Sequence, residues 1–151
     1  MSRYTPTSHM YPATLEQLRE FFKDDRFATE AGCKIDSMDD DSVTCSLEIQ
    51  PFHRNAAGGV MGGAIFTLAD LAFAVHSNRD YAINMTENLT LTLSSSINYL
   101  KPVISTTIYA KSSIINKGRN IGVFDIKVYD DKGRDIALIT TTGYTKGNDY
   151  S

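Results

Sequence analysis

The spacing of hydrophobic and polar residues divides the chain into helical and extended segments. Residues 14–24 carry apolar side chains at helical spacing, and Thr14 and Gln17 form the pattern of a capping box at their start. A longer apolar run over residues 62–78 predicts a second, more buried helix. Elsewhere the hydrophobic positions mostly recur every second residue, which is typical of strands with one buried face. The pattern therefore predicts a mixture of helices and strands.

The extended segments predict six strands joined mostly by short turns. The expected strands are residues 33–38, 42–50, 89–99, 104–115, 121–129 and 136–145. Because short connections join antiparallel neighbours, we expect the last four strands to form a meander. The apolar helix must then cover one face of the sheet. The expected fold class is α+β, with a long central helix wrapped by a curved antiparallel sheet.

Composition supports a single domain with a hydrophobic core. The 151 residues include 42% hydrophobic and 22% charged side chains, both ordinary for a globular protein. We expect residues 13–151 to form one domain and residues 1–12 a loose N-terminal segment. The net charge of −3 argues against a nucleic-acid surface, which normally carries a basic stripe.

The sequence shows no signal for export or membrane insertion. Residues 1–12 lack the apolar core of a signal peptide, and the longest apolar stretch is interrupted by Asp70 and too short to span a bilayer. Cys33 and Cys45 are too few for a disulfide framework and lack the spacing of metal ligands. We therefore expect two reduced core thiols in a cytoplasmic protein with neither a membrane nor a nucleic-acid partner.

A single carboxylate stands out within the apolar helix. Asp70 is the only acidic residue between His53 and His76. Burial of a carboxylate on such a helix is costly unless a partner or a function offsets the cost. Gly62 and Gly63 stand where the helix begins, so their N–H groups and the positive end of the helix dipole are available to an anion. Together these features predict an active site.

The segment from His53 to Asp70 reads HRNAAGGVMGGAIFTLAD. It resembles the core signature of hotdog-fold thioesterases, in particular the PaaI-like acyl-CoA thioesterases of phenylacetate degradation. The matching positions are His53, Asn55, Gly58 or Gly59, Met61–Gly62–Gly63 and Leu68–Ala69–Asp70. Weaker matches extend the resemblance over residues 40–145. One position differs, because the family often has a histidine where this chain has Met61.

The resemblance implies an acyl-CoA thioesterase that works as a homodimer or homotetramer without a metal or redox cofactor. Coenzyme A is then part of the substrate. Asp70 is implied as general base or nucleophile, the Gly62 N–H as oxyanion donor, and Asn55 as the holder of the attacking water or the thioester. The further candidates for substrate binding are His53, Met61, Gly63, Phe73, Thr92, Gly118, Arg119 and Asn120.

The spacing of the two central candidates bears on the number of subunits. Gly62 and Asp70 are eight residues apart, which is roughly 12 Å along a helix axis at 1.5 Å per residue. A single helix therefore cannot bring both groups to one carbonyl. If both act, the site must combine two chains, as the resemblance also implies.

Each candidate also has a structural explanation that the sequence leaves open. Asp70 can cap a neighbouring loop, the glycine pair can serve close packing at a turn, and Asn55 can shape the loop. His53 suits a loop hydrogen bond, and Phe73 suits the core as well as an acyl pocket.

Two other functions also remain open. One is a hotdog module that binds acyl-CoA without hydrolysing it. The other is a hotdog dehydratase or hydratase, which usually pairs a histidine with an acid near the helix start. Met61 occupies the expected histidine position and disfavours the second alternative.

Overall fold

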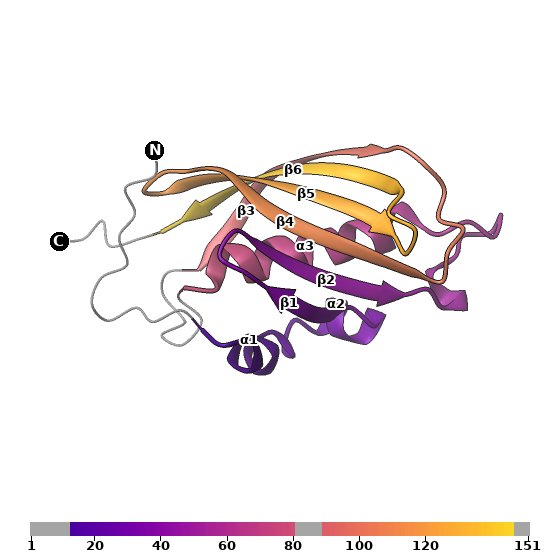
Figure 1. Ribbon diagram of the computed structural model, residues 1–151, viewed down its shortest axis with the longest axis horizontal. Coiled ribbons are helices and arrows are strands. Elements are labelled where there is room, and N and C mark those ends of the chain that lie inside the picture. The colour runs from indigo at the N-terminus through magenta and orange to yellow at the C-terminus, as the bar shows by residue number, and fades with distance from the viewer. Residues whose placement is uncertain (1–12, 81–88, 147–151) are drawn as a thin grey trace.

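The computed structural model describes residues 13–80 and 89–146 (Figure 1). Its helices are α1 (Leu15–Phe22), α2 (Arg26–Ala31) and α3 (Gly62–Asn78), with a 3₁₀ turn, η1, at Pro51–His53. Its strands are β1 (Lys34–Met38), β2 (Ser42–Glu48), β3 (Thr90–Tyr99), β4 (Thr107–Lys117), β5 (Ile121–Asp130) and β6 (Asp135–Thr145). Within these two stretches no helix is long and apolar enough to cross a lipid bilayer. The segment expected to be loose, residues 1–12, lies outside the described residues.

One antiparallel sheet with strand order β1-β2-β4-β5-β6-β3 forms the frame of the protein. The sheet curves around α3, while α1 lies beside β1 and α2 packs against α3 (Figure 1). The bounds of α3, Gly62 and Asn78, are those that the sequence predicts. The capping box of α1 is also confirmed, because Thr14 Oγ1 accepts the Gln17 N–H at 3.2 Å and Gln17 Oε1 accepts the Thr14 N–H at 2.8 Å. The expected hotdog architecture is therefore confirmed.

The strand order differs from the expected meander in the position of β3. Strands β4, β5 and β6 are consecutive neighbours, but β3 pairs with β6 at the sheet edge rather than with β4. Residues 100–106 carry the chain past the ends of β6 and β5, and the Leu100 N–H donates to the Ile136 carbonyl at 2.8 Å on the way. The meander prediction is wrong because this link, which contains Pro102, is too long for a hairpin.

Strand β3 is exposed along nearly its whole length. Leu91 and Leu93 are 64% and 59% exposed, and Thr90 is the one buried residue of the strand. The expected burial of one apolar face is therefore wrong for β3. A register irregularity between Thr92 and Ser94 interrupts the pairing with β6. On its other side β3 pairs with no strand of the described residues, so the backbone groups of that edge are open to another chain.

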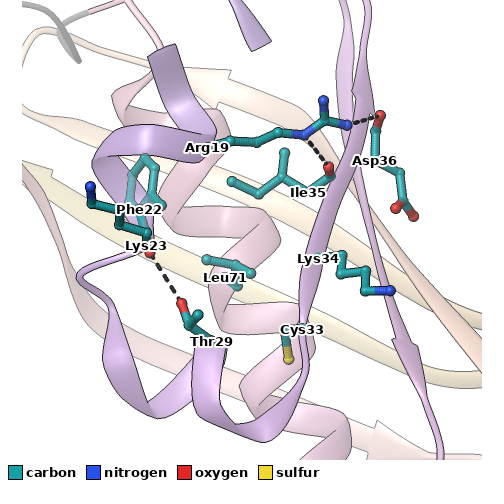
Figure 2. Close-up of a pocket in the computed structure, with 9 residues that line it drawn as sticks. All are labelled: Arg19, Phe22, Lys23, Thr29, Cys33, Lys34, Ile35, Asp36 and Leu71. Carbon is teal, nitrogen blue, oxygen red and sulfur yellow. Dashed lines mark hydrogen bonds between the residues drawn. The ribbon is translucent and has the colours of Figure 1, made fainter. Parts of the chain in front are cut away.

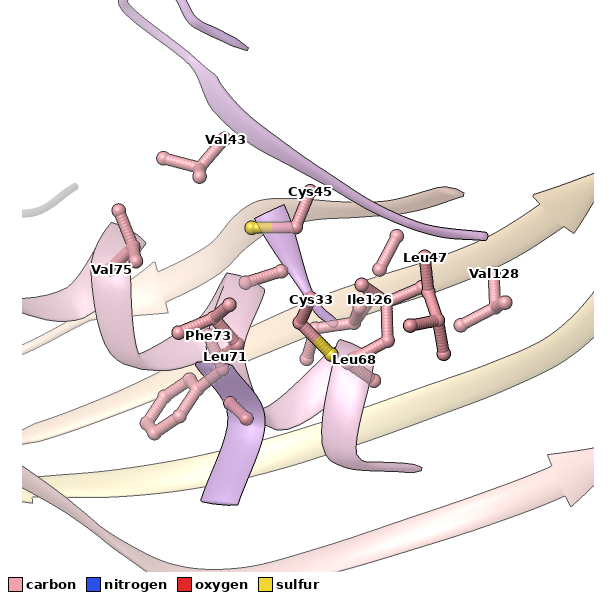
Figure 3. Packing of buried hydrophobic residues seen from close by; sticks show 14 of the residues in the cluster. Cys33, Val43, Cys45, Leu47, Leu68, Leu71, Phe73, Val75, Ile126 and Val128 are labelled. Atoms are coloured by element: carbon pink, nitrogen blue, oxygen red, sulfur yellow. The ribbon is translucent and has the colours of Figure 1, made fainter. Parts of the chain in front are cut away.

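The hydrophobic core fills the space between α3 and the concave face of the sheet (Figure 3). α3 is apolar on most of its circumference, as expected for a helix buried on several sides. Cys33 and Cys45 are free thiols within this core, as the sequence predicts. Burial raises the pKa of the Cys33 thiol to about 11 and raises that of Cys45 still further. Both thiols are therefore protonated at neutral pH.

His76 is a titratable side chain buried in the same core. Its Nδ1 lies 3.0 Å from Ser112 Oγ, its ring meets Phe124 edge-on, and its Nε2 has no hydrogen-bond partner among the described residues. Burial, and then the positive charges of Arg79 and Lys117, lower the pKa of His76 from 6.5 to about 3. His76 is therefore neutral in the folded protein at neutral and mildly acidic pH.

We expect acid to destabilise the protein through His76. The unfolded chain binds a proton at His76 below a pKa of 6.5, whereas the folded chain binds it only near pH 3. Above pH 6.5, His76 is neutral in both states and its titration does not lower the free energy of unfolding. As the pH drops below 6.5, the free energy of unfolding falls by up to about 1.4 kcal/mol per pH unit, because only the unfolded chain takes up the proton. Urea unfolding across this range should show a steeper loss of stability for the wild type than for His76→Phe, which cannot titrate there. Parallel curves for the two proteins would contradict this expectation.

Candidate active site

The N-terminus of α3 presents two backbone donors that no described residue uses. Met61 is the N-cap residue, and its side chain does not cap the helix. Within residues 13–80 and 89–146, the N–H groups of Gly62 and Gly63 make no hydrogen bond. The first N–H groups of a helix point outward along its axis, where the helix dipole adds partial positive charge. This end of α3 can therefore stabilise an oxygen that becomes negatively charged.

Tyr99, the last residue of β3, lies against Gly62 and is not among the residues predicted for the site. Its hydroxyl donates a hydrogen bond to the Gly62 carbonyl oxygen at 3.0 Å. A Cβ at position 62 would stand 3.0 Å from both Cζ and the hydroxyl oxygen of Tyr99, so a glycine permits this contact. The two residues are 37 positions apart, and the local sequence carries no signal that they meet.

Asn55 shapes the loop that leads into α3. Its Oδ1 accepts the N–H groups of Ala57 and Gly59, both at 3.0 Å, and its own N–H donates to the Gly59 carbonyl at 2.7 Å. Gly58 has a φ of 87°, a left-handed conformation that favours glycine in this tight turn. Asn55 Nδ2 makes no hydrogen bond with the described residues. Asn55 therefore has the structural role left open by the sequence, and it keeps one donor group for a ligand.

His53 is buried beneath the same loop, with 3% of its surface exposed. Its Nδ1 accepts the Gln50 N–H at 2.9 Å, so Nε2 carries the proton and donates to the Ala31 carbonyl at 2.7 Å. Both ring nitrogens are thus engaged, and none is left for a substrate. This corrects the assignment of His53 to substrate binding, because the ring instead fastens the loop to the end of α2.

Gly62 and Asn55 open into a cavity of about 490 Å³ between the loop before α3 and the link after β3. Tyr99, Lys101 and Val103 contribute further to its lining. Met61, at the same helix start, is 44% exposed. The cavity thus combines apolar walls with a positive charge and an unpaired backbone donor.

Asp70 opens into a different cavity, a groove of about 460 Å³ between α2 and α3. Helix α3 is buried, as predicted, but the expected burial of the Asp70 carboxylate is wrong for the single chain, because this side chain is exposed at the groove. Partial burial in the groove still raises the pKa of Asp70 above its ordinary 3.8, and the negative charge of Asp25 raises it further. A carboxylate with a raised pKa is a stronger base.

The cavities beside Gly62 and Asp70 have no lining residue in common. The two residues belong to one continuous helix, so they lie roughly 12 Å apart along its axis at 1.5 Å per residue. One chain therefore presents the backbone donor and the carboxylate to separate openings.

The other candidate residues lie in three different places. Phe73 is 2% exposed and packs edge-to-face against Phe124, so it belongs to the core. Thr92 is exposed on the edge strand β3, opposite Gly143 of β6. Residues 118–120 form the turn between β4 and β5, at the opposite end of the molecule from the start of α3 (Figure 1). The structure thus leaves these residues apart from Gly62 within one chain.

A third cavity, of about 420 Å³, lies between α1, α2 and β1 and contains none of the predicted site residues (Figure 2). Arg19 is one of its lining residues, and its Nε and one terminal nitrogen donate to the carbonyl oxygens of Ile35 and Asp36 at 2.9 and 3.1 Å. Lys23 pairs with Glu20. Arg19 thus fastens α1 to β1, and Lys23 and Glu20 pair with each other. Across the described stretches, no group of three or more His, Cys, Asp or Glu side chains is placed to hold a metal ion.

The chain thus has a hotdog fold. Its central helix carries a carboxylate, and the first N–H groups of that helix bond to no described residue. The family model of the thioesterase superfamily matches residues 57–137, which run from the loop before α3 to the start of β6. The chain belongs to the thioesterase superfamily, and it is a thioester hydrolase.

Comparisons with individual proteins show which thioesterases this chain is similar to. The acyl-coenzyme A thioesterase PaaI of Escherichia coli is 27% identical over 118 residues, which cover 78% of this chain and 80% of that protein. A thioesterase structure from Haemophilus influenzae aligns with a TM-score of 0.81 at 20% identity over 90% of this chain and 92% of that one. A hypothetical thioesterase protein from Streptococcus pneumoniae, solved with coenzyme A, has a TM-score of 0.67 at 28% identity over 83% and 97%. The predicted resemblance to PaaI-like hotdog thioesterases is confirmed.

Proposed function

We propose that this protein hydrolyses acyl-CoA thioesters to a free acid and coenzyme A, with Gly62 of one subunit and Asp70 of another acting on the same carbonyl. The observation that carries the proposal is the pair of N–H groups at Gly62 and Gly63, which no described residue uses, on the helix that also bears Asp70. The name of the Escherichia coli relative and the coenzyme A in the Streptococcus pneumoniae structure support this substrate class.

The Gly62 N–H is the proposed oxyanion donor. Attack on the thioester carbon turns the carbonyl oxygen into an oxyanion, and a preorganised N–H donor near this oxygen lowers the barrier by ~3 kcal/mol. The oxyanion then collapses and expels the coenzyme A thiolate, which leaves without strong acid help. The cavity beside Gly62 includes Asn55, whose Nδ2 bonds to no described residue and can hold the thioester or the attacking water.

Asp70 is the proposed source of the attack. As a general base it takes a proton from water as the water oxygen bonds to the carbonyl carbon; as a nucleophile it forms an anhydride that water then hydrolyses. The raised pKa, caused first by burial and then by Asp25, favours the base role, because a carboxylate with a higher proton affinity takes the proton more readily. Neither route requires a metal or redox cofactor.

Strand β3 is the proposed subunit interface. Its outer edge lacks a partner strand among the described residues, and Leu91 and Leu93 are largely exposed beside it. An open apolar edge of ten residues is a liability in a lone subunit and is resolved by pairing with a second copy. Such pairing makes a homodimer, and two such dimers make a homotetramer. The partner's β4–β5 turn, residues 118–120, is then a candidate contact for coenzyme A.

Release of free thiol from a panel of acyl-CoA thioesters tests the proposed function. We expect the wild type to hydrolyse at least one short, medium-chain or aromatic acyl-CoA with a kcat/KM of about 10⁴ M⁻¹s⁻¹ or higher, in the ordinary range for enzymes. Treatment with a metal chelator should leave this rate unchanged. Saturable binding of acyl-CoA without thiol release would instead support the non-catalytic hotdog module.

A further inference from the structure

The groove beside Asp70 has features that the proposed reaction does not use. Helices α2 and α3 form its two sides, and Phe27, Phe66 and Leu71 give it an apolar lining. We propose that this groove is the acyl subsite, that it selects acyl groups without a negative charge, and that Asp25 sets this preference. This inference rests on the proposed acyl-CoA hydrolysis.

The groove lies next to Asp70, where the acyl group of a bound thioester must be. A carbonyl attacked by Asp70 must lie in contact with that carboxylate, and a carbonyl attacked by water held on Asp70 must lie no more than one water molecule away. The acyl substituent starts one bond further on, and the groove borders Asp70 directly. Its volume of about 460 Å³ lies within the range of small-molecule pockets.

The apolar side of the groove includes an aromatic ring that the fold does not bury. Phe27 is 80% exposed, whereas its neighbour Ala28 is the buried residue of α2. Phe66 faces the same groove from α3 and is partly buried. Large exposed apolar side chains that line a groove next to a reactive group are typical of ligand contacts.

The charge of the groove is negative. Asp25 stands at the N-cap position of α2 but makes no side-chain capping bond, and its carboxylate has no hydrogen bond or ion pair among the described residues. The basic side chain at the groove, Arg26, is paired with Glu30. Burial raises the pKa of both Asp25 and Asp70, as expected for carboxylates that share a partly enclosed space. A third carboxylate on the acyl chain would be repelled.

Asp25 can be changed without loss of the helix that carries it. Its side chain makes no capping hydrogen bond to α2, and Asn serves as well as Asp at an N-cap position. Asp24 is a matched control, since it is an exposed neighbouring carboxylate that lies outside the groove lining.

The decisive experiment compares hexanoyl-CoA with adipoyl-CoA, which has the same six-carbon chain but ends in a carboxylate. We expect the wild type to prefer hexanoyl-CoA, and Asp25→Asn to reduce the ratio of the two kcat/KM values by roughly tenfold, the effect of one nearby charge. Asp24→Asn should change the ratio less than twofold. An unchanged ratio in Asp25→Asn, or an equal drop in Asp24→Asn, would overturn the assignment of Asp25.

A second variant tests the apolar wall. Phe27→Ala should raise the KM for hexanoyl-CoA at least about fivefold with kcat nearly unchanged, because it removes contacts with the acyl chain that are the same in the ground state and the transition state. Phe52→Ala is the control, since Phe52 is also an exposed phenylalanine (63%) but lies on η1, outside the groove. A Phe27→Ala protein with an unchanged KM but an altered native mass would show that Phe27 covers a subunit interface instead, and would overturn the subsite.

The proposed hydrolysis and the proposed acyl subsite are refuted by different results. If the wild type releases thiol from no acyl-CoA, the proposed function itself is wrong. If it hydrolyses hexanoyl-CoA but the Asp25 and Phe27 variants keep the wild-type selectivity, the reaction stands and only the acyl subsite is wrong.

Discussion

Replacement of Asp70 by Asn should lower kcat for thioester hydrolysis by about 10²–10⁴-fold. The amide keeps the size of the side chain but can neither accept a proton from water nor attack the carbonyl carbon. Thiol release at saturating acyl-CoA measures the effect. Because the Asp70 side chain is exposed in the single chain, the variant should keep its native mass and unfolding temperature. Asp125→Asn, an equivalent change at an exposed carboxylate on β5, should leave kcat unchanged.

The pH profile gives an independent check on the same residue. Asp70 must be ionised to act, so kcat/KM should fall as the pH drops through its pKa. Burial, and then Asp25, raise that pKa above the ordinary 3.8, so the midpoint of this acid limb should lie above pH 3.8. An Asp70→Asn protein with full activity, or with the same acid limb in its residual activity, would remove Asp70 from the chemistry.

Mixed oligomers of two inactive variants should recover activity if the site lies between subunits. Asp70→Asn removes the carboxylate, and Gly62→Pro removes the N–H donor while keeping the helix, because proline is favoured at the first helical position. The preceding Met61 already has the extended conformation, with φ −64° and ψ 138°, that a following proline requires. In a dimer with one copy of each variant, one of the two sites keeps both the donor and the carboxylate.

Purified mixed dimers should therefore show about half of the wild-type activity, whereas each variant alone shows almost none. Two different affinity tags isolate the mixed species. Gly62→Ala is the control for the proline, because it introduces the same Cβ next to Tyr99 but retains the N–H. If the site were complete within one chain, both subunits of the mixed dimer would carry a defect, and activity would not return.

Local sequence patterns predicted the helices well. The capping box at Thr14 and Gln17 marks the start of α1, and the glycine pair and the apolar run give the bounds of α3. These signals act between residues three or four positions apart, so the sequence carries them directly. The predicted strands also lie close to the observed ones, because period-two alternation is likewise local.

The pairing and burial of β3 could not be predicted in the same way. The sequence suggested a meander, but β3 lies at the edge beside β6 and exposes Leu91 and Leu93. Strand pairing joins residues far apart in the chain, such as Ile97 and Ile139, and no local pattern encodes which partner is chosen. The alternation of apolar and polar residues in β3 is compatible with an exposed edge strand as well as with a buried strand.

The candidate site also has parts that the sequence predicted and parts that it could not predict. Asp70 and Gly62 stood out in the sequence because a lone carboxylate and a glycine pair are unusual in an apolar helix, and their separation along α3 follows from helix geometry. His53 and Phe73 belong to the same segment, yet the structure places both in the interior. Spacing along the chain therefore identified candidates without showing which of them face a cavity.

By itself, the sequence of this protein determined its fold class, the bounds of its central helix and the rule that one helix cannot bring Gly62 and Asp70 to the same carbonyl. These properties depend on local periodicity and on the fixed rise of a helix. Only the tertiary structure decided that β3 lies at an open edge, that Tyr99 contacts Gly62 and that Asp25 shares a groove with Asp70. Such contacts join elements distant in sequence, and they are decided by how the chain packs as a whole.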